Sequence, residues 1–306
     1  MAHFGKKGVL LVNLGTPDAP TRGAVYRYLK QFLLDRRVID YPWLARNILV
    51  WGIIAPFRSG KSAKLYQQLW TENGSPLKYY GELLAEGVQQ RLGDAYTVAL
   101  GMRYQSPSIE SAIDELLSQQ VSEIIVFPLF PQYAGATTGS VHEEVMRILA
   151  KKESIPNVKM VNSYYDEPSM IQIFADNARG FDLDSYDHIL FSYHGLPQRQ
   201  LRRADDCNHC LQKEDCCETI SKINQFCYSA QCHATTKAIA TELGLDRQRY
   251  TTTFQSRLGP EAWAQPYTSA VLEEQAEHGG NWDNVFLFNP GITIFDPGIS
   301  ERADIG

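Results

Sequence analysis

The chain has 306 residues, and 29 Lys and Arg against 35 Asp and Glu give it a formal net charge of −6 at pH 7. This acidic balance, without a basic run, argues against nucleic acid as a partner. The N-terminus shows no charged-then-apolar-then-small segment typical of a secretory signal, so we expect a cytoplasmic protein whose cysteines stay reduced. A chain of this length can bury two cores of ordinary size.

Apolar runs alternate with amphipathic stretches along the first half of the chain. The run 8–13 is continuously apolar and ends at Leu14, which is typical of a parallel strand buried on both faces. A loop rich in Pro and Gly, 128–139, follows another apolar run and is expected at the edge of a sheet where ligands bind. The pattern predicts helices over 21–34, 76–92, 108–117 and 140–149 and strands over 96–100, 123–127 and 158–162.

The most apolar stretch of the chain, residues 42–57, contains Trp43 and Trp51. It is too short, and with Arg46 and Asn47 too polar, to span a bilayer, which needs about 20 apolar residues. Basic residues follow it at Arg58, Lys61 and Lys64. Two interpretations fit this composition: a helix that lies at a membrane interface, or a helix packed in the protein core.

The second half of the chain repeats the alternation of strands and helices. The pattern predicts helices over 169–178, 234–243 and 268–278 and strands over 188–192, 251–255 and 285–288. Strands that alternate with helices form parallel sheets. The predicted fold class is therefore α/β, with two Rossmann-like domains, residues 1–165 and 166–306, whose parallel sheets face a shared cleft.

One histidine occupies a position that suits chemistry. His194 follows the predicted strand 188–192, so we expect it at a strand's carboxyl end, where α/β proteins bind ligands. An imidazole accepts protons near neutral pH and ligates metals. A lone histidine at a strand end is nevertheless more often structural, and His142, His209 and His233 are expected in surface or structural roles.

All the cysteines of the chain fall between residues 207 and 232. In a reducing compartment, thiolates clustered this closely hold a metal more often than they form disulfides. Four thiolates are the ligand set of structural Zn²⁺ or of an iron–sulfur cluster. The cysteines are Cys207, Cys210, Cys216, Cys217, Cys227 and Cys232.

Four blocks of sequence carry a resemblance to a known family. The block FSYHGLP resembles the F-S-x-H-G-[LI]-P signature of ferrochelatases, which insert Fe²⁺ into protoporphyrin IX, forming protohaem, at the last step of haem synthesis. Three further blocks agree with that family, and the resemblance covers roughly residues 8 to 290. The blocks are 101–104 (GMRY), 128–133 (PLFPQY) running into 137–140 (TTGS), 191–197 (FSYHGLP) and 254–260 (FQSRLGP).

The resemblance implies an enzyme, a lyase, with porphyrin and ferrous iron as substrates. It implies that His194 is catalytic, accepts pyrrole protons and ligates the substrate Fe²⁺. It also implies that residues 42–57 form a hydrophobic lip over the active site, with peripheral contact to a membrane from which porphyrin could enter. The residues that we expect to contact the porphyrin are Leu14, Arg103, Tyr104, Tyr133, Thr137 and Trp263.

One group of ferrochelatases carries a [2Fe–2S] cluster on an internal insert, which here corresponds to residues 205–232. Adjacent cysteines point in different directions, so Cys216 is the alternative to Cys217 as a ligand. Cys232 is expected to pack in the core, and a structural Zn²⁺ is the alternative to the cluster. The ligands that the resemblance implies are Cys207, Cys210, Cys217 and Cys227.

The C-terminal block departs from the family pattern. Ferrochelatases carry P-G-F-x-x-D-x-L-E-T-L, whose glutamate assists the histidine, and Gly298 stands at the position of that glutamate here. Asp296 and Glu301 are the candidate replacements. Together with a C-terminus that is shorter than in the family, this departure supports an alternative function: a porphyrin- or haem-binding protein that is impaired in catalysis.

Overall fold

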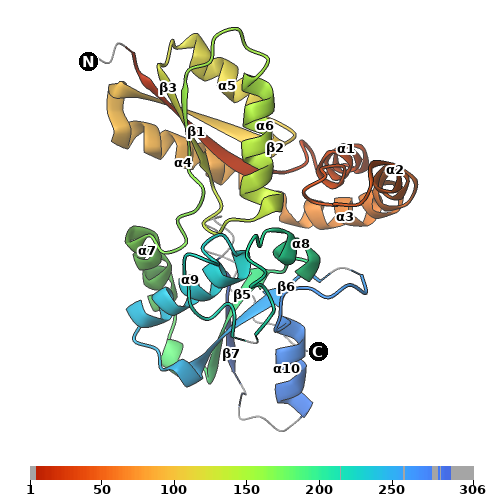
Figure 1. The fold of residues 1–306 in the computed structure, drawn as a ribbon, viewed down its shortest axis with the longest axis vertical. Helices are drawn as coiled ribbons and strands as arrows, with labels where there is room; N and C mark the ends of the chain where they lie inside the picture. The colour runs from red at the N-terminus through yellow and green to blue at the C-terminus, as the bar shows by residue number, and fades with distance from the viewer. Residues whose placement is uncertain (1–4, 214, 258, 278–281, 283, 291–306) are drawn as a thin grey trace. The chain divides into compact units, whose positions relative to one another are not determined.

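The protein contains two parallel β-sheets, one of four strands and one of three, which confirms the predicted α/β class (Figure 1). Contacts divide the described chain into two compact units. Within the described residues, the first comprises 5–130 and 135–162, and the second comprises 131–134 and the described part of 163–290. The candidate replacements Asp296 and Glu301, and Gly298, lie outside the described residues. This computed structural model describes residues 5–213, 215–257, 259–277, 282 and 284–290.

The sheet of the first unit has the order β2-β1-β3-β4, and every pair is parallel. The central strand β1 sends Leu10 and Val12 towards α5 and α6, and Val9 and Leu11 towards α4. A parallel sheet covered on both faces explains the continuous apolar runs in its strands. The elements are β1 (Lys7–Gly15), α4 (Pro76–Leu92), β2 (Tyr96–Tyr104), α5 (Ile109–Ser118), β3 (Glu123–Pro128), α6 (Ser140–Leu149) and β4 (Asn157–Met160).

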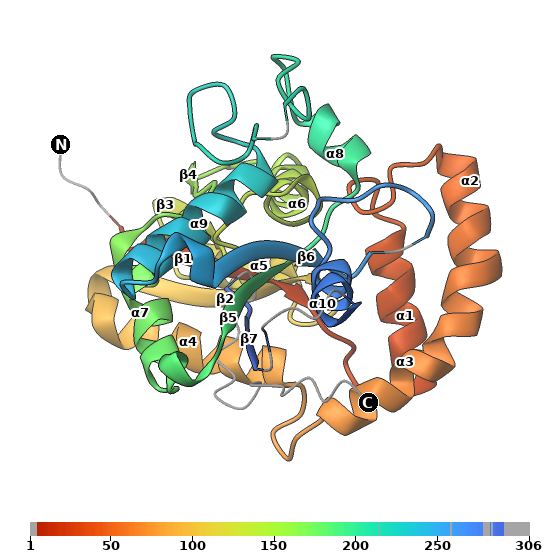
Figure 2. The ribbon, with the colours of Figure 1, turned by 90° about the horizontal axis from the view of Figure 1, so that it is seen from below.

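The part of the chain between β1 and α4 is helical. Thr21 caps the N-terminus of helix α1 (Arg22–Leu33), because its hydroxyl accepts a hydrogen bond from the N–H of Ala24 at 3.4 Å. Next come α2 (Trp43–Asn47), a π-helical segment η1 (Ile48–Ile54) and α3 (Ala55–Leu69), which run on as one helix beside α1 (Figures 1 and 2). Val50 and Ala55 of this run pack with Leu33 of α1. No helix among the described residues is long and apolar enough to cross a membrane.

The sheet of the second unit has the order β6-β5-β7 and is also parallel. Helices α7 and α9 cover the face that contains Phe191 and Tyr193. Ser192 points to the opposite face, where its hydroxyl lies 3.0 Å from that of Thr268, the first residue of α10. The elements are α7 (Pro168–Arg179), β5 (His188–His194), α8 (Gln198–Arg203), α9 (Tyr228–Glu242), β6 (Tyr250–Gln255), α10 (Thr268–Glu277) and β7 (Val285–Phe288).

Some boundaries differ from those predicted from the sequence. Helix α9 begins at Tyr228 rather than at 234, so Cys232 and His233 lie inside a helix. The buried face of α9 includes Gln231, Thr235 and Thr236, and these polar residues hide its amphipathic period. Strand β2 extends to Tyr104, and the short helix α8 was not predicted. Short helical turns complete the chain at η2 (Gly93–Ala95), η3 (Gly135–Gly139), η4 (Leu183–Ser185) and η5 (Arg247–Arg249).

Candidate functional site

His194 is the last residue of β5, and its side chain is exposed. Its Nδ1 lies 2.8 Å from the carbonyl oxygen of Gly195. Because a carbonyl oxygen only accepts hydrogen bonds, Nδ1 carries the proton of the neutral ring and Nε2 keeps its lone pair. The ring of Trp263 lies 6.4 Å from the imidazole, centroid to centroid. The arrangement leaves Nε2 able to accept a proton or to ligate a metal ion.

The backbone that carries His194 is fastened from two sides. The N–H of Gly195 donates to the carbonyl of Gln255 at 2.8 Å, and the phenol of Tyr228 donates to the carbonyl of His194 at 2.8 Å. A Cβ at Gly195 would lie 3.0 Å from the carbonyl oxygen of Gln255 and 3.3 Å from the ring of Trp263. Residue 195 is therefore a glycine at a close approach between the end of β5 and its neighbours.

Tyr133 belongs to the same compact unit as His194 and is held by α9. Its N–H donates to Oε1 of Gln231 at 2.6 Å, and its ring lies 6.4 Å from the ring of Phe226. The preceding residue, Gln132, donates through Nε2 to the hydroxyl of Thr235 at 3.0 Å. These bonds fix the segment Pro131–Ala134 against the helix that follows the cysteines.

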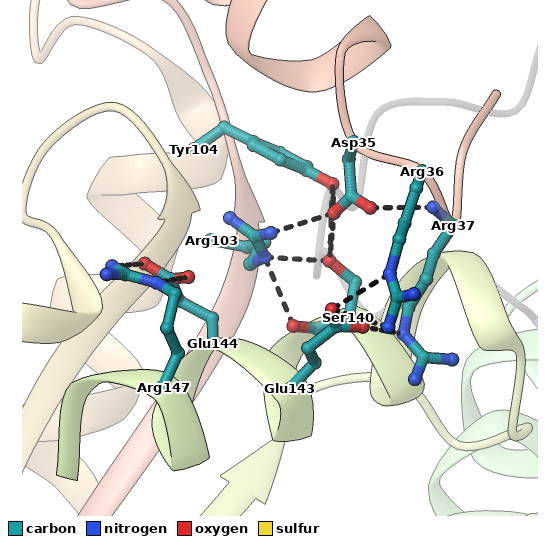
Figure 3. Close-up of polar contacts among 9 residues, drawn as sticks. All are labelled: Asp35, Arg36, Arg37, Arg103, Tyr104, Ser140, Glu143, Glu144 and Arg147. Atoms are coloured by element: carbon teal, nitrogen blue, oxygen red, sulfur yellow. Dashed lines mark hydrogen bonds and ion pairs between the residues drawn. The ribbon is translucent and has the colours of Figure 1, made fainter. Parts of the chain in front are cut away.

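In the first unit, Arg103 and Tyr104 bind a buried carboxylate (Figure 3). Asp35, just after α1, accepts hydrogen bonds from Ser140 at 2.5 Å, Arg103 at 2.8 Å and Tyr104 at 2.9 Å. Burial raises the pKa of Asp35, but the hydrogen bonds from Ser140 and the N–H of Arg37, with the charge of Arg103, bring it below its ordinary value. Tyr104 is completely buried, so its hydroxyl supports Asp35 and presents no surface.

A second carboxylate extends this network. Glu143 of α6 forms an ion pair with Arg36 at 2.9 Å and another with Arg37 (Figure 3). The turn after α1 is thereby tied to α6 as well as to β2. Sequence reasoning did not select Asp35, Ser140 or Glu143 as site residues. The signal that could have selected Asp35 is three consecutive charged residues placed directly after an amphipathic helix.

The other expected residues of the first unit lie at the ends of their elements. Leu14, half-buried at the end of β1, precedes Gly15, which is paired in register with Tyr104. Gly15 has φ of +109°, and a Cβ there would lie 2.0 Å from the carbonyl oxygen of Tyr104, so no side chain fits. Thr137 is half-buried in η3, immediately before α6. The structure thus brings Leu14 and Tyr104 to one edge of the sheet.

The cysteine-rich segment lies between α8 and α9. Asp205 folds its first part, because the carboxylate accepts the N–H groups of Cys207, His209 and Cys210 at 3.0, 2.6 and 2.7 Å. All the cysteines are free. Within the described part of the chain, no three His, Cys, Asp or Glu side chains are placed together so that they could hold a metal ion. The cysteines that line a cavity of about 170 Å³ in this segment are Cys207, Cys210, Cys216 and Cys227.

The pKa values of Cys227 and Cys210 are shifted in opposite directions, which bears on metal binding. A hydrogen bond from Cys217, together with the N–H groups of Ser229 and Ala230 at the start of α9, lowers the pKa of Cys227. Burial, with Cys227 and Cys216 nearby, raises the pKa of Cys210 to about 12. A thiol of lowered pKa at a helix N-terminus, beside further thiols around a cavity, is the donor chemistry of a [2Fe–2S] or zinc site. The cysteines fit such a group in kind and line one cavity, although no three of the described side chains are yet placed together as ligands.

Comparisons with known proteins agree on one family. A family model described as Ferrochelatase matches residues 6–294. A curated ferrochelatase of Legionella pneumophila (strain Corby) is 45% identical over 274 residues, which cover 90% of this chain and 81% of that protein. One from Coxiella burnetii (strain CbuK_Q154) is 46% identical over 278 residues, which cover 90% and 77%.

A solved structure also matches, at a lower level. The crystal structure of the sirohydrochlorin chelatase SirB from Bacillus subtilis subspecies spizizenii in complex with cobalt has a TM-score of 0.44 and 11% sequence identity. The match covers 94% of this chain and 88% of that one. The fold is established by the parallel sheets described above.

Proposed function

The chain belongs to the ferrochelatase family and is an enzyme of haem synthesis, and on that premise we propose which of its residues insert Fe²⁺ into protoporphyrin IX. In this reaction two pyrrole N–H protons leave the porphyrin. The Fe²⁺ substrate exchanges water ligands for the four porphyrin nitrogens, and protohaem forms. The protein therefore has to supply a proton acceptor that is in contact with solvent.

The observation that supports our proposal is the hydrogen bonding and the exposure of the His194 side chain. With Nδ1 held by the carbonyl of Gly195, Nε2 is the acceptor nitrogen and has no hydrogen-bond partner among the described residues, and the side chain is exposed at the end of β5. We assign to Nε2 the acceptance of pyrrole protons and contact with the incoming Fe²⁺. Water takes the protons from the exposed ring, which returns to its neutral form for the next turnover. Trp263 offers a flat apolar surface beside it for the macrocycle.

The test is anaerobic insertion of Fe²⁺ into protoporphyrin IX, followed by absorption, in the parent and in His194→Ala. We expect the variant to lose a factor of about 10² or more in rate, because a positioned proton acceptor contributes that much. Porphyrin binding, measured by fluorescence quenching, should stay within a few-fold of the parent. The control is His142→Gln, since His142 lies in α6 and contacts the carbonyl of Val161 at 3.1 Å. Parent-like insertion by His194→Ala would overturn the assignment.

We propose that Leu14, Arg103 and Thr137 of the first unit contact the porphyrin, as do Tyr133 and Trp263 of the second. Tyr104 acts indirectly, because it is fully buried and donates to Asp35, which also holds Arg103. The two compact units are, in this proposal, the two domains that the alternating strands and helices predict.

For the cysteine-rich segment we propose a [2Fe–2S] cluster, with zinc as the alternative occupant. Cys207, Cys210 and Cys227 would supply three ligands, and Cys216 or Cys217 the fourth. The cavity supports Cys216, which lines it, and Cys217 is instead engaged with Cys227. When bound, a cluster would cross-link the segment and add a visible chromophore.

We further propose that the helical run α2–η1–α3 contacts a membrane surface as a peripheral anchor, in a reducing cytoplasmic setting. One side of the run packs on α1 through Val50 and Ala55. The other side of the run exposes an apolar surface, where 69% of Trp43 and 75% of Phe57 are exposed to solvent. Arg58, Lys61 and Lys64, all exposed, suit anionic lipid headgroups. The further exposed apolar side chains of this run are Leu44, Ile48, Trp51, Ile53, Leu65 and Leu69.

A further inference from the structure

The first turns of α9 contact three parts of the candidate site at once. Tyr228, Gln231 and Thr235 recur at helical spacing, which places them on one side of the helix. Tyr228 bonds to the strand end that carries His194. Gln231 and Thr235 bond to the segment that carries Tyr133. The same turns follow directly on Cys227, the last cysteine of the cavity.

Gln231 forms the tightest of these links. Its side chain is completely buried, its Oε1 accepts the N–H of Tyr133 at 2.6 Å, and its Nε2 donates to the carbonyl of Gln225 at 2.6 Å. One amide group therefore joins the backbone of the cysteine-rich segment to the backbone of Tyr133. Phe226, next to Gln225, adds a ring contact to Tyr133. If this buried amide loses one partner, an unsatisfied polar group is left in the interior and the folded protein is destabilised. The two bonds therefore depend on each other.

Tyr228 forms the second link. Its hydroxyl donates to the carbonyl oxygen of His194 at 2.8 Å, and its own backbone follows Cys227. A movement of Cys227 thus reaches the carbonyl of His194 through one side chain. The bond acts on the backbone of His194 and leaves Nε2 free, which is what positioning requires.

We propose that Gln231 and Tyr228 are positioning residues, which set the backbone at Tyr133 and His194 according to whether the cysteine-rich segment is folded around its metal. This inference rests on the proposed function, since it takes His194 and Tyr133 as the residues that act on porphyrin. Gln225 and Cys227 both line the cavity, so in this proposal loss of the metal disturbs them first. The disturbance passes through two hydrogen bonds to the two site residues.

The first test is amide hydrogen exchange, with Cys210→Ser as the perturbation of the segment. In the parent background Cys210→Ser should speed exchange of the Tyr133 amide about tenfold, which is the loss of about one hydrogen bond. In Gln231→Met that amide should already exchange fast, and adding Cys210→Ser should change it less than about twofold. The control is Thr241→Ala at the far end of α9, whose hydroxyl donates to the carbonyl of Lys237.

Two outcomes would overturn the proposal. Cys210→Ser could speed exchange of the Tyr133 amide by the same factor in the parent and in Gln231→Met, or it could leave the exchange rate unchanged in both. The amide of Ile189 in the core of β5 serves as an internal reference, because it would speed up too if a variant simply unfolded. Exchange does not require iron insertion. A protein that shows the coupling but forms no haem would therefore reject the proposed function and leave the positioning in place.

The second test uses Tyr228→Phe, which removes one hydroxyl and no packing. We expect kcat for iron insertion to fall about tenfold with KM for porphyrin within twofold, because one backbone hydrogen bond at His194 is lost. The visible spectrum of the cysteine-rich segment should be unchanged. Tyr193→Phe is the matched control, since Tyr193 is also in contact with α9, through the hydroxyl of Thr236 at 3.0 Å. Equal losses in both variants would show a merely structural effect and sink the assignment of Tyr228.

Discussion

Ser140 donates its hydroxyl hydrogen to Asp35, with 2.5 Å between Oγ and Oδ2. Ser140 is the first residue of α6, and Asp35 lies in the turn after α1, so the bond joins elements that are far apart in the chain. The same carboxylate holds Arg103 at the end of β2. The turn that leads into the exposed helical run is therefore anchored at the edge of the sheet.

Replacing this anchor should destabilise the protein. Asp35 is buried, with 6% of its side chain exposed, and its bonds to Arg103 and Ser140 involve a full charge. We expect Asp35→Asn to lower the free energy of unfolding by on the order of 2 kcal/mol or more, as measured by urea denaturation. The matched control is Asp114→Asn, because Asp114 forms an exposed pair with Lys152, and it should change stability by less than about 1 kcal/mol. Similar values for the two variants would contradict the anchor.

The same carboxylate should contribute to acid sensitivity. The folded-state pKa of Asp35 lies below its ordinary value of 3.8, so the unfolded state binds the proton first as the pH falls. The stabilisation is fully present above that ordinary value and is lost as the pH drops through the folded-state pKa. We expect the parent to lose stability below about pH 4 more steeply than Asp35→Asn does. Parallel curves would show that Asp35 does not titrate in this way.

His188 should make the protein less stable in mild acid. Burial, with Arg247 and Arg249 nearby, lowers the pKa of His188 to about 4 from 6.5. Its Nε2 lies 2.9 Å from the hydroxyl of Thr251, and its ring stacks on Trp282. Between these pKa values only the unfolded state takes up the proton, so stability should fall as the pH drops from 6.5 towards 4. Urea unfolding at several pH values should show a weaker dependence in His188→Gln, and an unchanged dependence would contradict the assignment.

The cysteine-rich segment predicts a chromophore that depends on particular thiols. Cys207→Ser, Cys210→Ser and Cys216→Ser should each bleach the visible absorption of anaerobically purified protein, because these residues line the cavity. Cys232→Ala is the control, since Cys232 is fully buried in the core and away from the lining. Stoichiometric zinc without sulfide would reject the cluster in favour of zinc. Bleaching by Cys217→Ser but not by Cys216→Ser would exchange their roles.

The exposed helical run predicts vesicle binding. Trp43→Ser combined with Trp51→Ser should weaken sedimentation with anionic vesicles about tenfold or more, because each indole contributes on the order of 1 kcal/mol or more when it enters the interface. Trp51 also lies under Lys30, with the ammonium 4.0 Å from the ring centroid. The control is Leu83→Ser with Leu84→Ser on α4, which are 44% and 39% exposed. A double tryptophan variant that binds as the parent does would remove the membrane proposal.

Most of the fold could be predicted from the sequence because most of the protein core is apolar. Leu10 and Val12 belong to a continuous run whose strand follows from hydropathy alone. The start of α9 was missed because its buried face includes Gln231, Thr235 and Thr236, which are satisfied by hydrogen bonds to distant segments. Periodicity detects burial through apolar side chains, so a helix buried through polar contacts stays hidden from it.

The candidate site was predictable only where one residue follows directly from its element. His194 could be placed because its strand ends there. The Asp35 network could not, because Arg103 and Ser140 meet that carboxylate only after β2 and α6 have packed. The bridge from Gln225 through Gln231 to Tyr133 likewise exists only in the folded chain. Local patterns place single residues, and partners distant in the chain come from the fold.

The contact between Gly15 and the carbonyl of Tyr104 sets a limit on mutational tolerance. A library that varies every position should return no functional variant at residue 15, because even the methyl group of Ala would displace strand backbone. Gly52, Gly60 and Gly87 should accept Ala, since a Cβ at each meets no atom within 4 Å. For Gly87, in the middle of α4, the change should raise stability by about 0.5–1 kcal/mol. Residue 15 can therefore only be glycine, because no side chain fits at this position.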